Sequence, residues 1–448
     1  MYLPVKKRYV KAVMVATSPL KIGSGENDAT DSDVLLDAKG EPFVPGTAIA
    51  GLMRHYLAEK VFDTPKNQES IEDSKSVEDI VDYWFGYIVK NQDIGQASKV
   101  NTFDAPQIIK THSEARGQWP VSTRDGVKLD SFKTVEANSK YDYQVVNKGT
   151  SFNLKLEIDY DDNPPAITDG KEYCLDCLTN DIIAGFQTGD ISIGGKTTRG
   201  FGRVKLYDIK YQDIDMRSKA GIDSYLKFCW ETGNWETYEA KPEGIASSIY
   251  ENPRIIKFNI PSFLIIRNLA SLEKSGYQDK LVDAEMLKAD DHTAAQTTTL
   301  PVIPGTSWAG LFRHHMYKIL MRANYGEKPT EDFLNSVFGY VQGKRKAKSK
   351  IEFEESYVSD SNQVNRTRNA VDRFTGGAGD KKLFTTQVSY GGHFELSIKW
   401  RKAIPGIDMC LLDSLVTTAI ADINEGLAAI GGMTAIGGGI LVQEVYNA

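Results

Sequence analysis

Cysteine is scarce in this sequence, and basic residues do not outnumber acidic ones. The 448 residues include 4 cysteines, and 53 basic against 60 acidic residues give a net charge of −7. This balance excludes a uniformly basic nucleic-acid coat, but it leaves room for a local basic groove, because recognition depends on where charge lies. Cys174 and Cys177 form a single CxxC pair, which is weak evidence for a zinc or redox site. We expect both to be apolar core residues of a helix.

Long apolar runs are also missing, and none is long enough to cross a bilayer. The first residues place basic side chains before an apolar stretch, as a signal peptide would. However, Lys11 interrupts that stretch, and its apolar residues alternate as in a strand. We therefore expect an intracellular, cytoplasmic protein with no membrane partner.

Glycine is concentrated in the segment SIGGKTTRGFGRVKL, which starts at Ser192. Its Gly195-Lys196-Thr197 resembles the end of a phosphate-binding P-loop. A P-loop needs a glycine at position 190, which is Asp190 here, and it opens a helix rather than a strand. The residues that follow alternate like a half-buried strand, so we expect a turn that feeds a strand and no nucleotide-hydrolysing site.

The sequence contains an internal repeat. FVPGTAIAGLMRHYL at 43–57 returns as VIPGTSWAGLFRHHM at 302–316, and WFGYIV at 84–89 returns as VFGYVQ at 337–342. Three more pairs follow in the same order: TRDGVKLDSF with TRNAVDRF, YQVVNKGTSFNLKLEID with TQVSYGGHFELSIKW, and the glycine turn with AIGGMTAIGGGILVQEV. Collinear repeats of this kind predict two copies of one domain. The predicted units are residues 1–212, a linker over 213–252, and residues 253–448.

Each copy shows the same order of predicted elements: strand, helix, irregular middle, strand, helix and closing strand. Thr47 and Thr306 follow Pro-Gly and are expected to be the N-caps of the first helices. The other elements are expected at 8–22 and 254–268, 152–160 and 393–401, and 174–186 and 408–426. This order is the ferredoxin-like, or split βαβ, pattern. We therefore predict an α+β fold with antiparallel sheets and helices on one face.

The ordered set of motifs resembles the RAMP superfamily of CRISPR-associated proteins. The set comprises Pro-Gly-Thr with a helix ending in Gly-Leu-x-Arg, Phe-Gly, Asp-x-Phe or Asp-Arg-Phe, and a closing glycine-rich loop. In particular, the chain resembles a fusion of two backbone subunits from a type III effector complex. The resemblance implies two tandem ferredoxin-like (RRM-like) domains with thumb-like insertions. It also implies assembly along a CRISPR guide RNA with other effector subunits, where the thumbs displace nucleotides of the guide–target duplex.

The resemblance further implies an endoribonuclease in which an Asp between the first strand and the first helix cuts target RNA with Mg²⁺ or Mn²⁺. Asp31 lies 14 residues before Pro45, and Asp290 lies 14 before Pro304. Asp290 matches by spacing only, because it lacks the apolar residues that follow Asp31. A kinked nucleotide allows in-line attack by the 2′-hydroxyl, and a carboxylate can hold a metal ion against the phosphate. The alternative for Asp31 is a solvated acidic loop.

RNA binding without sequence preference needs phosphate contacts from Lys, Arg and free backbone amides. The helix N-termini after Pro-Gly-Thr suit an anion, and equivalent basic residues recur in both copies. Surface salt bridges explain any single one of these arginines equally well. The residues predicted to contact RNA are Thr47, Arg54, Arg124, Lys196, Arg199, Arg203, Thr306, Arg313 and Arg368.

Three functions remain open at this point. The first is a backbone subunit that binds guide RNA and cuts target RNA, and the second is an RNA-binding scaffold subunit without an active centre. The third is a guide-RNA-processing endonuclease of the same superfamily, or an unrelated RNA-binding protein. Two Pro-Gly-Thr modules favour the first two, since a processing enzyme needs one site per RNA hairpin.

Overall fold

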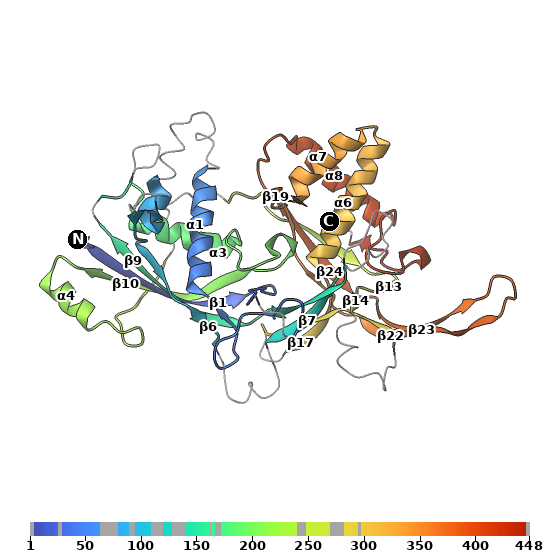
Figure 1. The fold of residues 1–448 in the computed structure, drawn as a ribbon, viewed down its shortest axis with the longest axis horizontal. Helices are drawn as coiled ribbons and strands as arrows, with labels where there is room; N and C mark the ends of the chain where they lie inside the picture. The colour runs from blue at the N-terminus through green and yellow to red at the C-terminus, as the bar shows by residue number, and fades with distance from the viewer. Residues whose placement is uncertain are drawn as a thin grey trace.

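The structure is a computed structural model whose described residues form two α+β halves (Figure 1). We call residues 4–239 the first half and residues 248–444 the second half. The described residues are 4–25, 29–62, 79–88, 95–108, 120–127, 139–161, 163–165, 172–239, 248–268, 282–293, 297–343 and 345–444.

An antiparallel sheet forms the centre of the first half. In spatial order it consists of β11 (Glu236–Thr237), β10 (Val204–Asp215), β1 (Lys6–Ala16), β9 (Ser151–Tyr160) and β5 (Val100–Thr102). Residues of β1 alternate between the two faces, as the sequence pattern predicted, and Val10, Ala12 and Met14 are buried in the core. Met14 lies opposite both Phe152 and Leu206. The side chains of these three central strands therefore build one apolar face.

The sheet of the second half repeats this arrangement. In spatial order it consists of β20 (Ile351–Phe353), β24 (His393–Trp400), β12 (Arg254–Asn259) and β25 (Val442–Gln443). Its order matches β5-β9-β1-β10 strand for strand, and Phe258 lies opposite Phe394 as Met14 lies opposite Phe152. The order 4-1-3-2, counted along the chain, is that of the expected split βαβ pattern.

Helices cover one face of each sheet (Figure 1). They are α1 (Gly46–Phe62) and α3 (Leu175–Thr188) in the first half, and α6 (Gly305–Arg322), α7 (Glu327–Phe338) and α8 (Met409–Asn424) in the second. Residues 79–85 are also helical. Trp84 and Phe186 pack with the first sheet, and Trp308 and Phe312 with the second, in two separate cores. Each half therefore buries its own apolar residues.

The starts of α1 and α6 differ from the prediction that Thr47 and Thr306 are N-caps. α1 begins at Gly46, so Thr47 is already helical, and the N-cap of α6 is Pro304, which makes no side-chain capping bond. The amide of Gly46 instead donates to Asp104 Oδ1 at 2.8 Å. A carboxylate from a neighbouring loop therefore caps α1, where a phosphate contact was expected.

Hairpins and short strands connect these elements. The longer hairpins are β7 (Val121–Gly126) with β8 (Tyr141–Val146), β16 (Lys288–Asp291) with β17 (Thr298–Ile303), and β22 (Asn362–Val371) with β23 (Ala378–Tyr390). The short strands are β2 (Phe43–Val44), β3 (Tyr87–Ile88), β4 (Gly95–Gln96), β6 (Ala105–Pro106), β13 (Phe263–Leu264), β14 (Arg267–Asn268), β15 (Ala284–Met286), β18 (Tyr340–Gln342), β19 (Arg345–Ala347) and β21 (Ser356–Tyr357).

Part of the predicted linker packs on the first half. β10 continues to Asp215, and α4 (Lys219–Leu226) and β11 follow. Phe228 stacks on Tyr9 with ring centroids 3.8 Å apart, and Trp230 stacks on Trp235 at 5.6 Å. Tyr9 alternates with core-facing Val10, so these rings cover the sheet face opposite the helices. RRM domains bind RNA on this face, which the chain's own aromatic side chains occupy here.

Candidate functional site

The two glycine turns have the same backbone. Each contains a short 3₁₀ segment, η1 (Thr197–Arg199) or η2 (Thr434–Ile436). The residue before it is left-handed in both, with φ of 58° at Lys196 and 59° at Met433. Non-glycine residues seldom adopt this conformation. The turn is therefore maintained in both halves although its side chains differ.

Glycine is required where each turn meets the loop after the first strand. Gly194 and Gly431 both have φ of 82°, and a Cβ there would overlap with the carbonyl oxygen of Lys21 or Ile265. The amide of the following glycine donates to that same oxygen, at 2.8 Å and 2.9 Å respectively. These glycines thus allow backbone to approach backbone. This backbone contact explains why glycine is concentrated in the turn without requiring a bound phosphate.

An acidic residue stands at an equivalent corner in each half. The amide of Asp31 donates to Asp142 Oδ1 at 2.9 Å, and the amide of Asp142 donates to Asp31 Oδ2 at 3.0 Å. In the second half, the amide of Asp283 donates to the Thr385 carbonyl at 2.7 Å, and the amide of Thr385 donates to Asp283 Oδ2 at 2.7 Å. We call these the first and second acidic corners. Both Asp31 and Asp283 are exposed.

Neighbouring hydrogen bonds establish that Asp31 and Asp283 are equivalent. Four residues after each Asp, a leucine amide donates to the loop that contacts the glycine turn. Leu35 donates to the Ile22 carbonyl at 2.8 Å, and Leu287 donates to the Ile266 carbonyl at 2.7 Å. Asp283 therefore occupies in the second half the place that Asp31 occupies in the first.

Asp290 lies elsewhere, which corrects its pairing with Asp31. It belongs to the β16–β17 hairpin, where Thr299 Oγ1 donates to Asp290 Oδ1 at 2.7 Å. Leu35 precedes Pro45 by 10 positions, whereas Leu287 precedes Pro304 by 17. The second copy thus has a longer loop, and counting back from the proline reached this hairpin instead of the corner.

A sequence signal for Asp283 exists. Asp31-Ser-Asp-Val-Leu and Asp283-Ala-Glu-Met-Leu share the pattern Asp, any residue, acid, apolar residue, Leu. Asp283 has the apolar residues whose absence after Asp290 was noted. Only this pattern identifies Asp283, because the loop before it is also longer: Asp31 follows Ile22 by 9 positions, whereas Asp283 follows Ile266 by 17.

The first acidic corner offers two carboxylates and the second offers one. Asp142 faces Asp31, whereas the equivalent residue in the second half is the neutral Thr385. Asp33 is engaged in its own turn, accepting from the amides of Ala29 and Thr30 at 2.9 Å each. Among the described residues, no group of three His, Cys, Asp or Glu side chains could hold a metal ion. A divalent cation at either corner would depend on water and substrate oxygens for most of its ligands.

A group of basic residues lies beside the first glycine turn. Lys196 Nζ donates to the Tyr141 hydroxyl at 3.2 Å and lies 3.3 Å from the centre of the Tyr143 ring. Lys21 Nζ lies 4.4 Å from the centre of the same ring. Within the described residues, neither lysine has a carboxylate within salt-bridge distance, and the same holds for Arg199. We call Lys21, Lys196 and Arg199 the basic corner.

Burial and like charge act together on the basic corner. Burial, followed by the positive charges of Lys21, Arg199 and Arg124, lowers the pKa of Lys196 to about 7. Burial also lowers the pKa of Lys21. Cations held together without a counter-charge favour an anion between them. Tyr141 directly precedes Asp142, so β8 contacts the basic corner through Tyr141 and Tyr143 and contributes Asp142 to the first acidic corner.

The second half carries no cation at the three positions equivalent to the basic corner. The residues equivalent to Lys21, Lys196 and Arg199 are Ile265, Met433 and Ile436. Ile436 is 48% exposed. The same backbone thus displays cations in one half and apolar side chains in the other.

Arg124 and Arg203 lie inside the contact between the halves, which corrects their prediction as RNA contacts. Arg124 is 2% exposed and pairs with Glu355, and Arg203 is 6% exposed and pairs with Glu352. Glu352 also receives Lys399, whose Nζ lies 3.5 Å from Oε2. RNA phosphates cannot reach guanidinium groups buried to this extent. These pairs join the two halves, and we call them the ionic join.

The charges of the ionic join control the ionisation of Glu352. Burial by itself raises the pKa of this carboxyl, but Arg203 and Lys399 hold it below the ordinary value. The Tyr250 hydroxyl donates to Glu352 Oε1 at 2.8 Å. Glu352 therefore stays ionised, and the positive charges of Arg203 and Lys399 balance its negative charge.

Arg54 and Arg313 make equivalent hydrogen bonds in their halves. Arg54 Nη1 donates to the Gly86 carbonyl at 2.6 Å, just after the helical residues 79–85. Arg313 Nη1 donates to the Leu334 carbonyl at 3.3 Å in the last turn of α7. Each guanidinium binds the C-terminal end of the next helix, where a cation is favourable. Their predicted contacts with RNA stay a prediction.

The β22–β23 hairpin contains the counterpart of Arg124. Arg124 lies opposite Tyr143 on β8, and Arg366 lies opposite Thr386 at the equivalent position on β23. Arg366, rather than Arg368, is therefore the structural equivalent of Arg124. It is half-buried, with its guanidinium 4.0 Å from the centre of the Phe263 ring. Arg368 is also half-buried on the same strand.

The β22–β23 hairpin extends away from the rest of the second half (Figure 1). Phe374 at its tip is 95% exposed, and Leu383 further back is 65% exposed. Asp372 stabilises the turn by accepting from the amides of Phe374 and Thr375 at 2.9 Å and 2.8 Å. An apolar ring on an ordered, projecting turn is a feature that the sequence reading did not identify as functional.

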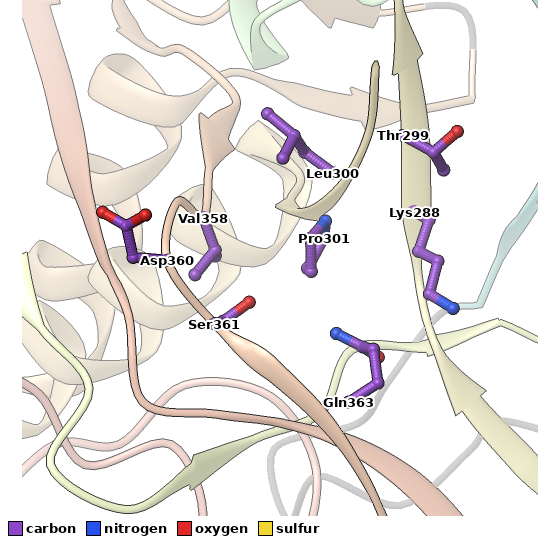
Figure 2. Close-up of a pocket in the computed structure, with 8 residues that line it drawn as sticks. All are labelled: Lys288, Thr299, Leu300, Pro301, Val358, Asp360, Ser361 and Gln363. Carbon is purple, nitrogen blue, oxygen red and sulfur yellow. The ribbon is translucent and has the colours of Figure 1, made fainter.

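A hollow of about 280 Å³ lies between the β16–β17 hairpin and the start of β22 (Figure 2). Lys288 Nζ on its wall donates to Gln387 Oε1 at 3.1 Å. Its lining residues are Lys288, Thr299, Leu300, Pro301, Val358, Asp360, Ser361 and Gln363. The wall contains one carboxylate and one amine from different elements, so it lacks the paired acids of a hydrolytic centre.

No helix within the described residues is long and apolar enough to cross a membrane. A protein-family model described as the RAMP superfamily matches residues 13–205 and 287–442. No curated protein matches the chain.

Proposed function

Because this chain belongs to the RAMP superfamily, we propose that it is a double backbone subunit of a type III CRISPR ribonucleoprotein that cuts complementary target RNA. Membership of the superfamily supports an RNA-binding subunit of a CRISPR-associated complex. The proposal goes beyond family membership in three respects. It adds target cleavage at the acidic corners, dependence on Mg²⁺ or Mn²⁺, and the type III assignment. Its partners would be guide RNA, target RNA and other effector subunits.

One observation carries this proposal: two exposed aspartates, Asp31 and Asp283, are held in the same way at the same corner. In each case one carboxylate oxygen accepts from a backbone amide of the returning hairpin strand. That bond fixes the direction of the carboxylate. The same bond recurs at the equivalent place in both halves, and this recurrence supports a shared role.

The donors at the first corner suit a hard cation. Asp31 and Asp142 present carboxylate oxygens, the ligands that Mg²⁺ and Mn²⁺ take, and one or two carboxylates are sufficient when phosphate oxygens supply others. Such an ion, when bound, neutralises charge that develops on the phosphate. The chain's own part is to hold Asp31 toward the phosphate and to keep the target strand in place.

In-line attack by a 2′-hydroxyl needs a nucleotide that has left the stack, because stacked A-form RNA seldom aligns the attacking and leaving oxygens. The projecting hairpin supports this step. Phe374 at its tip is suited to insert between bases, and Arg366 and Arg368 on β22 are placed to neutralise backbone phosphates. Unstacking one step costs on the order of a few kcal/mol, which phosphate contacts would offset.

The basic corner supports guide-strand binding in the first half. Lys21, Arg199 and, in its protonated form, Lys196 provide cations next to a turn whose backbone is already engaged. The second half would bind RNA with fewer charges, through Arg366 and Arg368. The alternative function, a scaffold subunit without cleavage, is favoured by the absence of a three-ligand metal group among the described residues.

The test is cleavage of a complementary target by the complex assembled with the double variant Asp31→Ala, Asp283→Ala. We expect both cuts to disappear, while guide RNA and target RNA remain bound with unchanged affinity. EDTA should have the same effect on the parent complex. If the double variant cuts like the parent, the scaffold function is correct.

A further inference from the structure

We infer that Cys174 and Cys177 form a dithiol that closes to a disulfide by exchange with a small-molecule disulfide such as oxidised glutathione. The two sulfur atoms lie 3.0 Å apart, at the start of α3. This site is independent of the proposed RNA chemistry. The sequence reading treated both residues as core, and the structure separates their roles.

The two cysteines differ in access. Cys174 is the N-cap of α3 and is partly exposed, whereas Cys177 is buried in the first core at 8% exposure. Burial, together with the hydrogen bond to Cys174, raises the pKa of Cys177 to about 12. An external disulfide can therefore reach Cys174, while Cys177 stays protonated behind it.

The N-cap position places a backbone amide against the sulfur of Cys174. The amide of Cys177 donates to Cys174 Sγ at 3.3 Å, as backbone amides do to an N-cap acceptor. The second half has Asp408 at the N-cap of α8, where it accepts from the amides of Cys410 and Leu411 at 2.9 Å and 3.3 Å. This point of the fold thus accommodates an anion, and a thiolate at a helix N-terminus is the reactive form of cysteine.

The exchange balances without a further reactant. The Cys174 thiolate attacks one sulfur of oxidised glutathione, forms a mixed disulfide and releases one glutathione thiolate, which takes up a proton. Cys177 then attacks the Cys174 sulfur, its proton passes through solvent to the departing sulfur, and the second glutathione leaves as a thiol. Two protein thiols are oxidised and one external disulfide is reduced to two thiols.

Little movement is needed for closure. A disulfide bond is about 2.05 Å long, so the sulfur atoms must approach by roughly 1 Å. The other two cysteines lack this arrangement: Cys229 Sγ donates to Glu231 at 2.9 Å, and Cys410 is exposed on α8.

The experiment uses the full chain with Cys229→Ser and Cys410→Ser, so that only the pair remains. After incubation with oxidised glutathione, we expect both thiols to disappear, no glutathione to be retained, and dithiothreitol to restore the thiols. Adding Cys177→Ser should trap one glutathione on Cys174. Adding Cys174→Ser should slow modification by at least about tenfold, because the remaining thiol is buried.

Serine is itself a good N-cap, so Cys174→Ser is expected to keep its helical circular dichroism and melting temperature. The unaltered protein provides a second measurement: peptide mass mapping should find the segment with both cysteines lighter by two hydrogens after oxidation. A stable mixed disulfide in the parent, or equal reaction rates for Cys174→Ser and Cys177→Ser, would overturn the inference.

Discussion

The two halves use one backbone and place different side chains on it. Their glycine turns agree in φ at the left-handed residue and at the glycine that contacts the first-strand loop. On that backbone, Lys196 is replaced by Met433 and Lys21 by Ile265. The glycines therefore serve the fold, while the side chains around them decide what each half contacts.

A second difference lies in what the equivalent arginine of each half contacts. Arg124 of the first half is buried against Glu355 of the second, whereas its equivalent Arg366 has an aromatic ring as its neighbour. The arginine at this position therefore forms an ion pair between the halves in one case and is half-buried against an aromatic ring in the other. Substitutions at equivalent positions test whether the two halves differ in these contacts.

The largest effect is expected at the ionic join. Arg124→Ala leaves Glu355 buried without its ion-pair partner, a change that destabilises a protein by about 3–5 kcal/mol. The matched variant Arg366→Ala removes only a cation–π contact and should cost about 1 kcal/mol or less. The measurement is the free energy of unfolding by urea. Equal losses in the two variants would contradict the account of the join.

Intermediate effects are expected in the glycine turns. Gly194→Ala and Gly431→Ala each place a Cβ against a carbonyl oxygen at a positive φ, so each should destabilise the chain by about 1–3 kcal/mol. Gly195→Ala is the control, since its Cβ would lie 3.8 Å from the nearest atom. Thermal unfolding compares the three. A Gly431→Ala protein as stable as Gly195→Ala would show that the turns are not equivalent.

A smaller, pH-dependent effect is expected at the basic corner. Lys196 has a pKa of about 7, so it is charged below pH 7 and neutral above it. Bound phosphate favours the charged form, so affinity for single-stranded RNA should fall as pH rises, by about tenfold per pH unit at most above pH 7. Fluorescence anisotropy at constant salt measures this slope.

The control is Lys196→Met, which introduces the residue of the second half. Its RNA affinity should be lower at pH 6.5 and should change little up to pH 8.5. A slope equal to that of the parent would mean that Lys196 does not contact RNA.

Repetition made most of the fold predictable. The strands of both sheets were predictable from the alternation of apolar residues, the two Pro-Gly-Thr helices and the glycine turns. Both copies show the same local sequence patterns, so each supported the assignment of the other. Contacts between the halves were not predictable: nothing local distinguishes the buried Arg124 from an exposed arginine. Asp31 could be selected from its surroundings, but Asp290 was selected by counting across a loop whose length differs. Phe374 belongs to the repeated Asp-Arg-Phe motif, but its place at a projecting tip was not predictable, because its exposure depends on how far the hairpin projects.

The most direct test of the account compares Asp283→Ala with Asp290→Ala in the assembled complex, by mapping the positions of target cuts. The account predicts that Asp283→Ala removes one cut, that Asp31→Ala removes the other, and that Asp290→Ala retains both. Loss of a cut in Asp290→Ala together with normal cleavage in Asp283→Ala would contradict it.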